Sequence, residues 1–282
     1  MPPFAIPAQV RNEERHPVPS RPLIMGIVNV TPDSFSDGGS HFDAQAAIDL
    51  GRQLIDEGAD ILDVGGESTR PGSHRVAPGE QWERIGAVVR ALAGGRVPVS
   101  VDTRSAVVAR RAIEAGAVII NDVSAGRDDA ALLPLVAEKG VDVILMHMQG
   151  SPDSMQQRPA YDDCVADVRA FLLERANHAE EAGVARERIW IDPGIGFGKT
   201  VQHNFQLLGG LSELTDTGYR VLLGTSRKSF IDKLYNAAVD HRIGGSLASL
   251  APAWRSRVHA VRVHDVRATF QFLELLTRLR QA

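Results

Sequence analysis

The sequence predicts one α/β domain in which eight parallel strands close into a barrel inside a ring of helices. Its 282 residues, 44% of them hydrophobic and 23% charged, are typical of a globular chain and suffice for a barrel of about 250 residues. An amphipathic stretch, a glycine and a short run rich in Val, Ile and Leu recur along the chain. Eight such units are the number found in the (β/α)8, or TIM, barrel. A doubly wound open sheet is the alternative, but no GxGxxG follows the first predicted strand.

The predicted barrel occupies residues 21–282 and follows an irregular N-terminal extension over residues 1–20. Prolines at positions 2, 3, 7, 17, 19 and 22 oppose regular structure in that extension. The strands are expected where short apolar runs are long enough to be buried parallel strands. They are residues 23–30, 61–65, 99–102, 118–122, 143–146, 189–192, 221–224 and 260–263.

Helices are expected between these strands, where apolar residues recur with helical spacing. They are residues 44–57, 82–92, 106–115, 130–139, 165–182, 202–215, 246–254 and 266–279. A glycine follows most of them and is expected to end the helix in the left-handed conformation. The glycines in question are Gly58, Gly116, Gly140, Gly183 and Gly218.

Charge and cysteine content exclude several classes of protein. The net charge of −4 disfavours a broad surface for nucleic acid or anionic membranes, so an anion has to bind at a local site. The single cysteine, Cys164, cannot form an internal disulfide, which favours a reducing compartment. Neither a signal peptide nor a long apolar span is apparent, and we expect a cytoplasmic protein.

Polar residues gather at the ends of the predicted strands. They are Asn29, Asp63, Asp102, Asn121, His147, Asp192, Arg262 and His264. Any one of them has an alternative role as a helix cap, as Asp102 before Thr103 and Asp122 before Ser124 illustrate. Their recurrence favours a site, because the carboxyl ends of barrel strands meet on the face that carries the active site in this fold.

Four loops after strands carry further candidate residues. The loops at 31–39 and 66–73 are longer than usual and rich in Gly, Pro and Ser, as closable lids are. Residues 192–199, DPGIGFGK, surround an aromatic side chain with three glycines. The sequence SRKS at 226–229 opens a predicted helix with two cations, which suits a carboxylate or phosphate. Arg262 and His264 lie on one side of the last strand and form a second candidate anion site.

These segments together resemble the dihydropteroate synthases, the folate-pathway enzymes that sulfonamides target. The resemblance runs from about residue 21 to the C-terminus and rests on long motifs in a fixed order. They are MGIVNVTPDSFSDGG (25–39), DILDVGGESTRPGS (60–73), SVDT (100–103), IINDVS (119–124), LMHMQG (145–150), IDPGIGFGKT (191–200), LLGTSRKSF (222–230) and VRVHDV (261–266).

The resemblance implies a transferase that joins 6-hydroxymethyl-7,8-dihydropterin diphosphate to p-aminobenzoate, giving 7,8-dihydropteroate and diphosphate. It also implies a TIM barrel, Mg²⁺ as cofactor and a homodimer. Asp102, Asn121, Asp192, Lys228 and Arg262 would bind the pterin. Two carboxylates, an amide and two cations suit a ring whose edge carries several N–H donors and a carbonyl.

The resemblance assigns the remaining residues to the other two groups. Asn29, Arg262 and His264 would bind the diphosphate, with Asn29 on Mg²⁺, and Asn29, Asp102, Lys228 and Arg262 would be the catalytic set. The residues for p-aminobenzoate would be Phe35, Thr69, Arg70, Pro71, Phe197 and Ser229. Two other functions stay open: a protein that binds pterin without transferring it, and a pterin-dependent methyltransferase on the same barrel. The arrangement favours a dissociative displacement, since no strong general base is evident near the amine site.

Overall fold

The computed structural model describes residues 20–31, 40–68, 73, 75–150 and 155–281, with the side chains of 40–43 left out. Its eight strands pair in parallel in chain order, and β8 returns to β1 to close the barrel. The (β/α)8 prediction is therefore confirmed. The strands are β1 (Leu23–Asn29), β2 (Ile61–Gly65), β3 (Val99–Asp102), β4 (Ile119–Asp122), β5 (Asp142–Met146), β6 (Ile189–Asp192), β7 (Arg220–Gly224) and β8 (Ala260–Val263).

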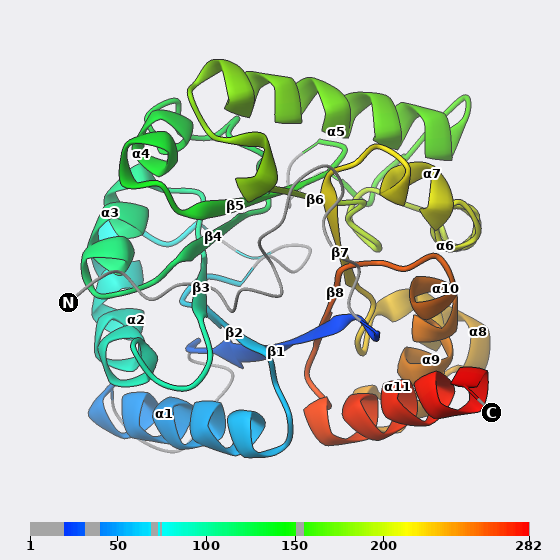
Figure 1. Ribbon diagram of the computed structural model, residues 1–282, viewed down its shortest axis with the longest axis horizontal. Helices are drawn as coiled ribbons and strands as arrows, with labels where there is room; N and C mark the ends of the chain where they lie inside the picture. The colour runs from blue at the N-terminus through cyan, green and yellow to red at the C-terminus, as the bar shows by residue number, and fades with distance from the viewer. Residues whose placement is uncertain (1–19, 32–39, 69–72, 74, 151–154, 282) are drawn as a thin grey trace.

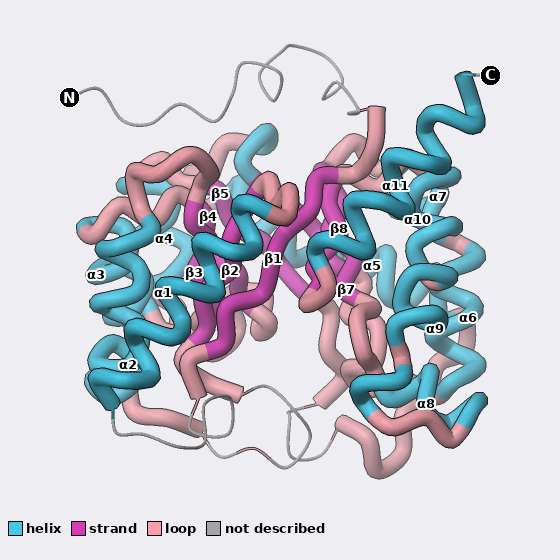
Figure 2. The backbone as a smooth tube through the Cα atoms, turned by 90° about the horizontal axis from the view of Figure 1, so that it is seen from below, coloured by secondary structure: helices cyan, strands magenta, loops and turns pink. Residues whose placement is uncertain are grey.

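Helices surround this barrel on all sides, as the view in Figure 1 shows. Figure 2 shows the strands in magenta enclosed between helices in cyan. The helices are α1 (Ser40–Asp56), α2 (Pro78–Leu92), α3 (Ala106–Glu114), α4 (Leu132–Lys139), α5 (Cys164–Glu181), α6 (Val201–Gly209), α7 (Leu211–Thr215), α8 (Ser229–Tyr235), α9 (Ile243–Ala248), α10 (Leu250–Arg255) and α11 (Val266–Gln281). Short 3-10 turns are η3 (Arg186–Arg188) and η4 (Val239–His241).

The predicted extension over residues 1–20 lies almost wholly outside the described residues and stays a prediction. The five glycines expected to end helices all have positive φ, between 60° at Gly140 and 105° at Gly58 and Gly116. Within the described part of the chain, no helix is both long and apolar enough to cross a membrane.

Two predicted helices are each two helices in the structure. The stretch 202–215 divides into α6 and α7 at Gly210, where a Cβ atom would lie 2.8 Å from Cγ1 of Val165 on α5. The stretch 246–254 divides into α9 and α10. Pro252 has no N–H to bond the carbonyl of Ala248, so one continuous helix cannot complete its ladder there.

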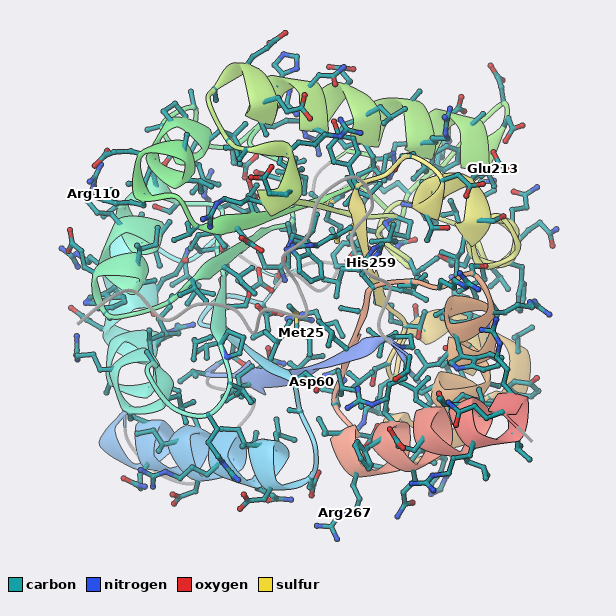
Figure 3. The ribbon with its side chains drawn as sticks, in the orientation of Figure 1. Met25, Asp60, Arg110, Glu213, His259 and Arg267 are labelled. Carbon is teal, nitrogen blue, oxygen red and sulfur yellow. The ribbon has the colours of Figure 1, made fainter. Side chains whose placement is uncertain are left out.

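The barrel interior begins with an apolar layer near the amino ends of the strands. Side chains from seven strands form it: Met25, Ile61, Ile119, Ile144, Trp190, Leu222 and Ala260. Figure 3 shows Met25 near the centre of the barrel, whereas Arg110, Glu213 and Arg267 point outward from the rim. This layer closes the barrel below the carboxyl ends of the strands, so a site there has an apolar floor.

Candidate active site

A polar layer lies directly above the apolar one. Asp63, Asn121, Asp192 and Arg262 each come two residues after a member of the apolar layer, and alternation along a strand points them to the same interior. Asp63, Asn121 and Asp192 are buried. Four of the eight strand-end residues expected at one mouth of the barrel therefore lie together in this layer.

Arg262 joins Asp63 of this layer to Asp102 at the end of β3, which we count with the layer from here on. Its Nε donates to Oδ2 of Asp63 at 2.6 Å, and its Nη2 donates to Oδ2 of Asp102 at 3.2 Å. Burial lowers the pKa of Arg262, but Asp63 and Asp102 outweigh it and leave that pKa raised. The guanidinium is thus charged and fixed in place by the two aspartates, while 22% of the side chain is exposed.

The pKa of Asp102 shows that burying its charge is costly. Burial raises the pKa of Asp102 to about 7, against the attraction of Arg262, which lowers it. Asp102 does not cap a helix, because its carboxylate accepts from Arg262 and the N–H of Ala106 at the start of α3 donates to Asp129 instead. The alternative reading of Asp102 as a cap is therefore wrong.

Asp122, in contrast, has a local role. Its carboxylate accepts hydrogen bonds from the N–H and hydroxyl of Ser124 and from the N–H of Gly126. These bonds shape the loop after β4 rather than a helix end, since the next helix is α4, which begins at Leu132.

Asn29 lies beside Asp102 at the end of β1. A Cβ atom on Gly65 would lie 3.8 Å from Oδ1 of Asn29 and 3.8 Å from Oδ2 of Asp102, so both oxygens approach one small space. Amide and carboxylate oxygens are the ligands that Mg²⁺ prefers. No group of three or more His, Cys, Asp or Glu suited to a metal occurs among the described residues.

Lys228, just after β7, also lies near Arg262. A Cβ on Gly224 would lie 3.8 Å from Cβ of Arg262 and 3.9 Å from Nζ of Lys228. Burial lowers the pKa of Lys228 to about 8, although the charge of Asp192 raises it. Burial in turn raises the pKa of Asp192, against Lys228 and the N–H of Gly194. These two groups stabilise each other's charge.

Phe197 and the loop of residues 193–199 cover Lys228. The Lys228 Nζ lies 4.7 Å from the centre of the Phe197 ring and donates to the carbonyl of Ile195. Gly194 and Gly198 of this loop pack against the loop after β5, where Cβ atoms would lie 1.9 Å from the carbonyl oxygen of His147 and 2.8 Å from that of Gln149.

Ser229 and His264 lie at the edge of the same mouth. Ser229 is the first residue of α8, as expected from the SRKS sequence. The backbone N–H of His264 donates to Oγ of Ser226, and its Nδ1 lies 3.1 Å from the same oxygen. Arg227 forms an ion pair with Asp265 at 2.5 Å, so its charge is used within the protein rather than for a ligand.

Two buried groups in this region differ from the expectation: Lys199 was given no role from the sequence, and His147 was expected among the strand-end residues of the site. Lys199 Nζ donates to the carbonyl of Phe197 at 2.9 Å and lies 2.8 Å from Nδ1 of His147. Burial lowers the pKa of Lys199 to about 7 and that of His147 to about 2. His147 therefore anchors the loop of Phe197 instead of joining the polar layer. The only sequence signal for the contact between His147 and Lys199 was the position of this lysine at the end of a glycine-rich loop.

Four residues expected at the p-aminobenzoate position lie outside the described residues. They are Phe35, Thr69, Arg70 and Pro71. Glu67, within the second predicted loop (66–73), is buried and pairs with Arg104 at 2.7 Å. The described part of that loop is thus fixed to the turn after β3.

Comparison with known proteins decides the family. The pterin binding enzyme family matches residues 25–264. A dihydropteroate synthase from Neisseria meningitidis serogroup C is 48% identical over 261 residues, covering 90% of this chain and 91% of that protein. The chain belongs to the dihydropteroate synthase family.

Solved structures of this family share the fold. A Xanthomonas albilineans dihydropteroate synthase with 4-aminobenzoic acid superposes with a TM-score of 0.87 at 46% identity, covering 93% of this chain and 94% of that one. Another structure of the Xanthomonas albilineans enzyme, in complex with 7,8-dihydropteroate, gives a TM-score of 0.84 at 43% identity and covers 93% and 95%. The family matches span all eight strands, so the polar layer lies inside the region shared with these proteins.

Proposed function

We propose that this chain is a dihydropteroate synthase, a transferase that joins 6-hydroxymethyl-7,8-dihydropterin diphosphate to p-aminobenzoate. The observation that carries the proposal is the polar layer of acids, amide and cations at the carboxyl end of the barrel. Family relatives solved with 4-aminobenzoic acid and with 7,8-dihydropteroate support p-aminobenzoate as a substrate and dihydropteroate as the product here.

The pterin would lie over the polar layer. Asp192 would accept the amino group and ring N–H of its guanine-like edge, as a carboxylate accepts two parallel donors. Asn121 and Asp102 would bind the other edges, and Lys228 would donate to a ring nitrogen or carbonyl. Arg262 would stack on the ring while facing the phosphates, since a guanidinium binds both aromatic faces and anions.

The diphosphate and p-aminobenzoate would bind on either side of the pterin. Asn29, Arg262 and His264 would hold the diphosphate, with Asn29 as the protein ligand of Mg²⁺, which binds mainly through substrate phosphates in such sites. Mg²⁺ would neutralise charge on the leaving diphosphate. Phe197 would contact the ring of p-aminobenzoate, with Ser229 at its carboxylate and Phe35, Thr69, Arg70 and Pro71 supplied by the loops.

The displacement would be dissociative. The C–O bond to diphosphate breaks first and diphosphate keeps the electron pair, so the methylene carbon becomes a cation that the dihydropterin ring delocalises. The aryl amine then forms the C–N bond and loses one proton to solvent. Asp102 and Asp192 would stabilise the positive half of this charge separation, and Arg262 and His264 the negative half.

Mass detection of dihydropteroate tests the function. Purified protein is incubated with the pterin diphosphate, p-aminobenzoate and Mg²⁺, and we expect dihydropteroate and diphosphate in equal amounts. Pterin binding without diphosphate release would favour the binding protein, and methyl transfer from a folate would favour the methyltransferase. Substituted anilines test the mechanism: a dissociative step predicts that kcat depends little on amine basicity.

A homodimer and a cytoplasmic location complete the proposal. Exposed apolar side chains support the dimer: Phe205 on α6, Leu234 and Tyr235 on α8, and Ile243 on α9. Exposed apolar side chains of this size on neighbouring helices are typical of interfaces. Sedimentation at micromolar concentration should give twice the chain mass of 30.5 kDa, and Tyr235→Glu should shift it to one chain.

A further inference from the structure

Asp63 contacts two ligand-facing residues at once. It lies on β2, is fully buried, and its Oδ2 accepts from Nε of Arg262 at 2.6 Å and from Nδ2 of Asn121 at 3.1 Å. β8 and β4 are each two strands away from β2 in the barrel, so both contacts cross the interior. The other oxygen, Oδ1, has no hydrogen-bond partner among the described residues.

The contact with Asp63 determines which end of the Asn121 amide meets a ligand. An amide has a donor end and an acceptor end, whereas an ionised carboxylate only accepts. Nδ2 of Asn121 must therefore face Asp63, and Oδ1 must face away from it. Oδ1 accepts no hydrogen bond from the described residues, so it is available as an acceptor.

The same carboxylate determines how Arg262 is placed. Nε is the guanidinium nitrogen nearest the backbone, and its bond to Asp63 fixes the plane of the group. Nη2 is held by Asp102 at 3.2 Å, and Nη1 makes no hydrogen bond to the described residues. The free end of the guanidinium is thus presented to the ligand in one orientation.

We propose that Asp63 is a positioning residue that makes the site select a ring edge rich in N–H donors. By fixing Asn121 with its oxygen outward, Asp63 adds a third acceptor to the carboxylates of Asp102 and Asp192. A ligand bearing an amino group satisfies these acceptors, whereas one bearing a carbonyl at the same place leaves them unpaired. This inference rests on the proposed function, since it assumes that a pterin binds here.

The test compares two ligands without diphosphate, 6-hydroxymethylpterin and 6-hydroxymethyllumazine, which carries a carbonyl in place of the 2-amino group. Dissociation constants are measured by titration calorimetry for the wild type, Asp63→Asn and the control Asp142→Asn. Asp142 is also a buried aspartate paired with an arginine, at the opposite end of the barrel. We expect the preference for pterin over lumazine to fall at least tenfold in Asp63→Asn, because its amide lets Asn121 turn over, and to stay unchanged in Asp142→Asn.

Equal weakening of both ligands in Asp63→Asn would mean a merely structural role and would overturn the inference. If that variant does not fold, the pair Asp63→Asn, Arg262→Gln removes both charges, and its pterin-to-lumazine ratio is expected to fall in the same way. A wild type that binds no pterin would overturn both the inference and the proposed function. A wild type that forms dihydropteroate, with an unchanged ratio in the variants, would overturn the inference alone.

Discussion

Each end of the barrel buries an aspartate against an arginine, and the two clusters differ in what else those residues contact. At the amino end, Asp142 accepts from Trp190 Nε1 at 3.0 Å and from Arg220 Nη1 at 2.9 Å, and only 6% of the Arg220 side chain is exposed. At the carboxyl end, Asp63 holds Arg262, of which 22% is exposed. The same kind of ion pair is therefore enclosed at the amino end of the barrel, whereas at the carboxyl end it leaves a cation facing outward.

The difference teaches that burial of a charge pair does not reveal its purpose. A buried pair contributes little net stability over an apolar replacement, but losing one partner is costly because the other charge is stranded. What separates the two clusters is exposure, since 22% of the Arg262 side chain is exposed against 6% of the Arg220 side chain. Arg262 and its neighbour Asn121 can therefore meet a ligand at the mouth of the barrel, whereas Arg220 is enclosed.

The largest effect is expected from Asp142→Asn. Its amide leaves Arg220 without a counter-charge, so the free energy of unfolding should fall by about 3 to 5 kcal/mol. Urea denaturation followed by circular dichroism measures it. Because the cluster lies at the opposite end from the site, kcat of the folded variant should equal that of the wild type, and a tenfold lower kcat would contradict the division between the ends.

Asp102→Asn should have the opposite effects, lowering kcat while leaving the stability unchanged or higher. Removing this fixed charge should raise the reaction barrier by roughly 2 to 4 kcal/mol, which lowers kcat about 30- to 1,000-fold. Since burial raises the pKa of Asp102, its charged form costs stability, and the variant should be as stable as the wild type or more so at pH 8. Wild-type activity in this variant would contradict the electrostatic role.

The pH dependence gives a third comparison. Burial raises the pKa of Asp102 from 3.8 to about 7, so between these values the folded chain binds a proton that the unfolded chain has lost. The contribution of Asp102 to the free energy of unfolding should therefore fall as the pH rises from about 4 to 7. Over the last one or two pH units of this range, kcat/KM for the pterin substrate should rise about tenfold per pH unit.

Above pH 7 the protonation of Lys228 limits kcat/KM. Its pKa of about 8 predicts that kcat/KM falls again as pH rises through 8, so the whole profile is bell-shaped. Stopped assays from pH 5 to 9 measure it. Asp102→Asn is the control: it should lose the acid limb of both profiles, and an unchanged acid limb would assign the titration to another group.

Much of the fold could be predicted because its signals are local. β2, β3, β6 and β8 begin and end at the expected residues, since a buried parallel strand is an apolar run that ends at a polar residue or glycine. The helix break at Gly210 was not predicted, although two adjacent glycines at 209–210 are a local signal for it; the contact with Val165 explains only why residue 210 has no Cβ.

The candidate site likewise has a part that the sequence predicts and a part that it does not. Asp102, Asn121, Asp192 and Arg262 could be placed at one mouth from strand ends alone. The link from Asp63 to Arg262 could not, because it joins residues far apart in sequence and depends on closure of the barrel between β8 and β1. Lys199 was missed because a loop lysine is normally exposed, and only the three-dimensional structure buries it.

The smallest effect is expected within the amino-end cluster, at Arg188. Its Nη1 lies 3.5 Å from Oδ1 of Asp142, and 36% of its side chain is exposed, so solvent screens the pair. Arg188→Gln should therefore lower the free energy of unfolding by less than about 1 kcal/mol, as exposed pairs do. Arg220→Gln, which breaks the buried pair, should cost about 3 kcal/mol or more. Urea denaturation of both variants at low and high salt checks the difference. Equal losses would mean that Asp142 shares its charge among both arginines, and the amino end would then be stabilised by a network rather than by one buried pair.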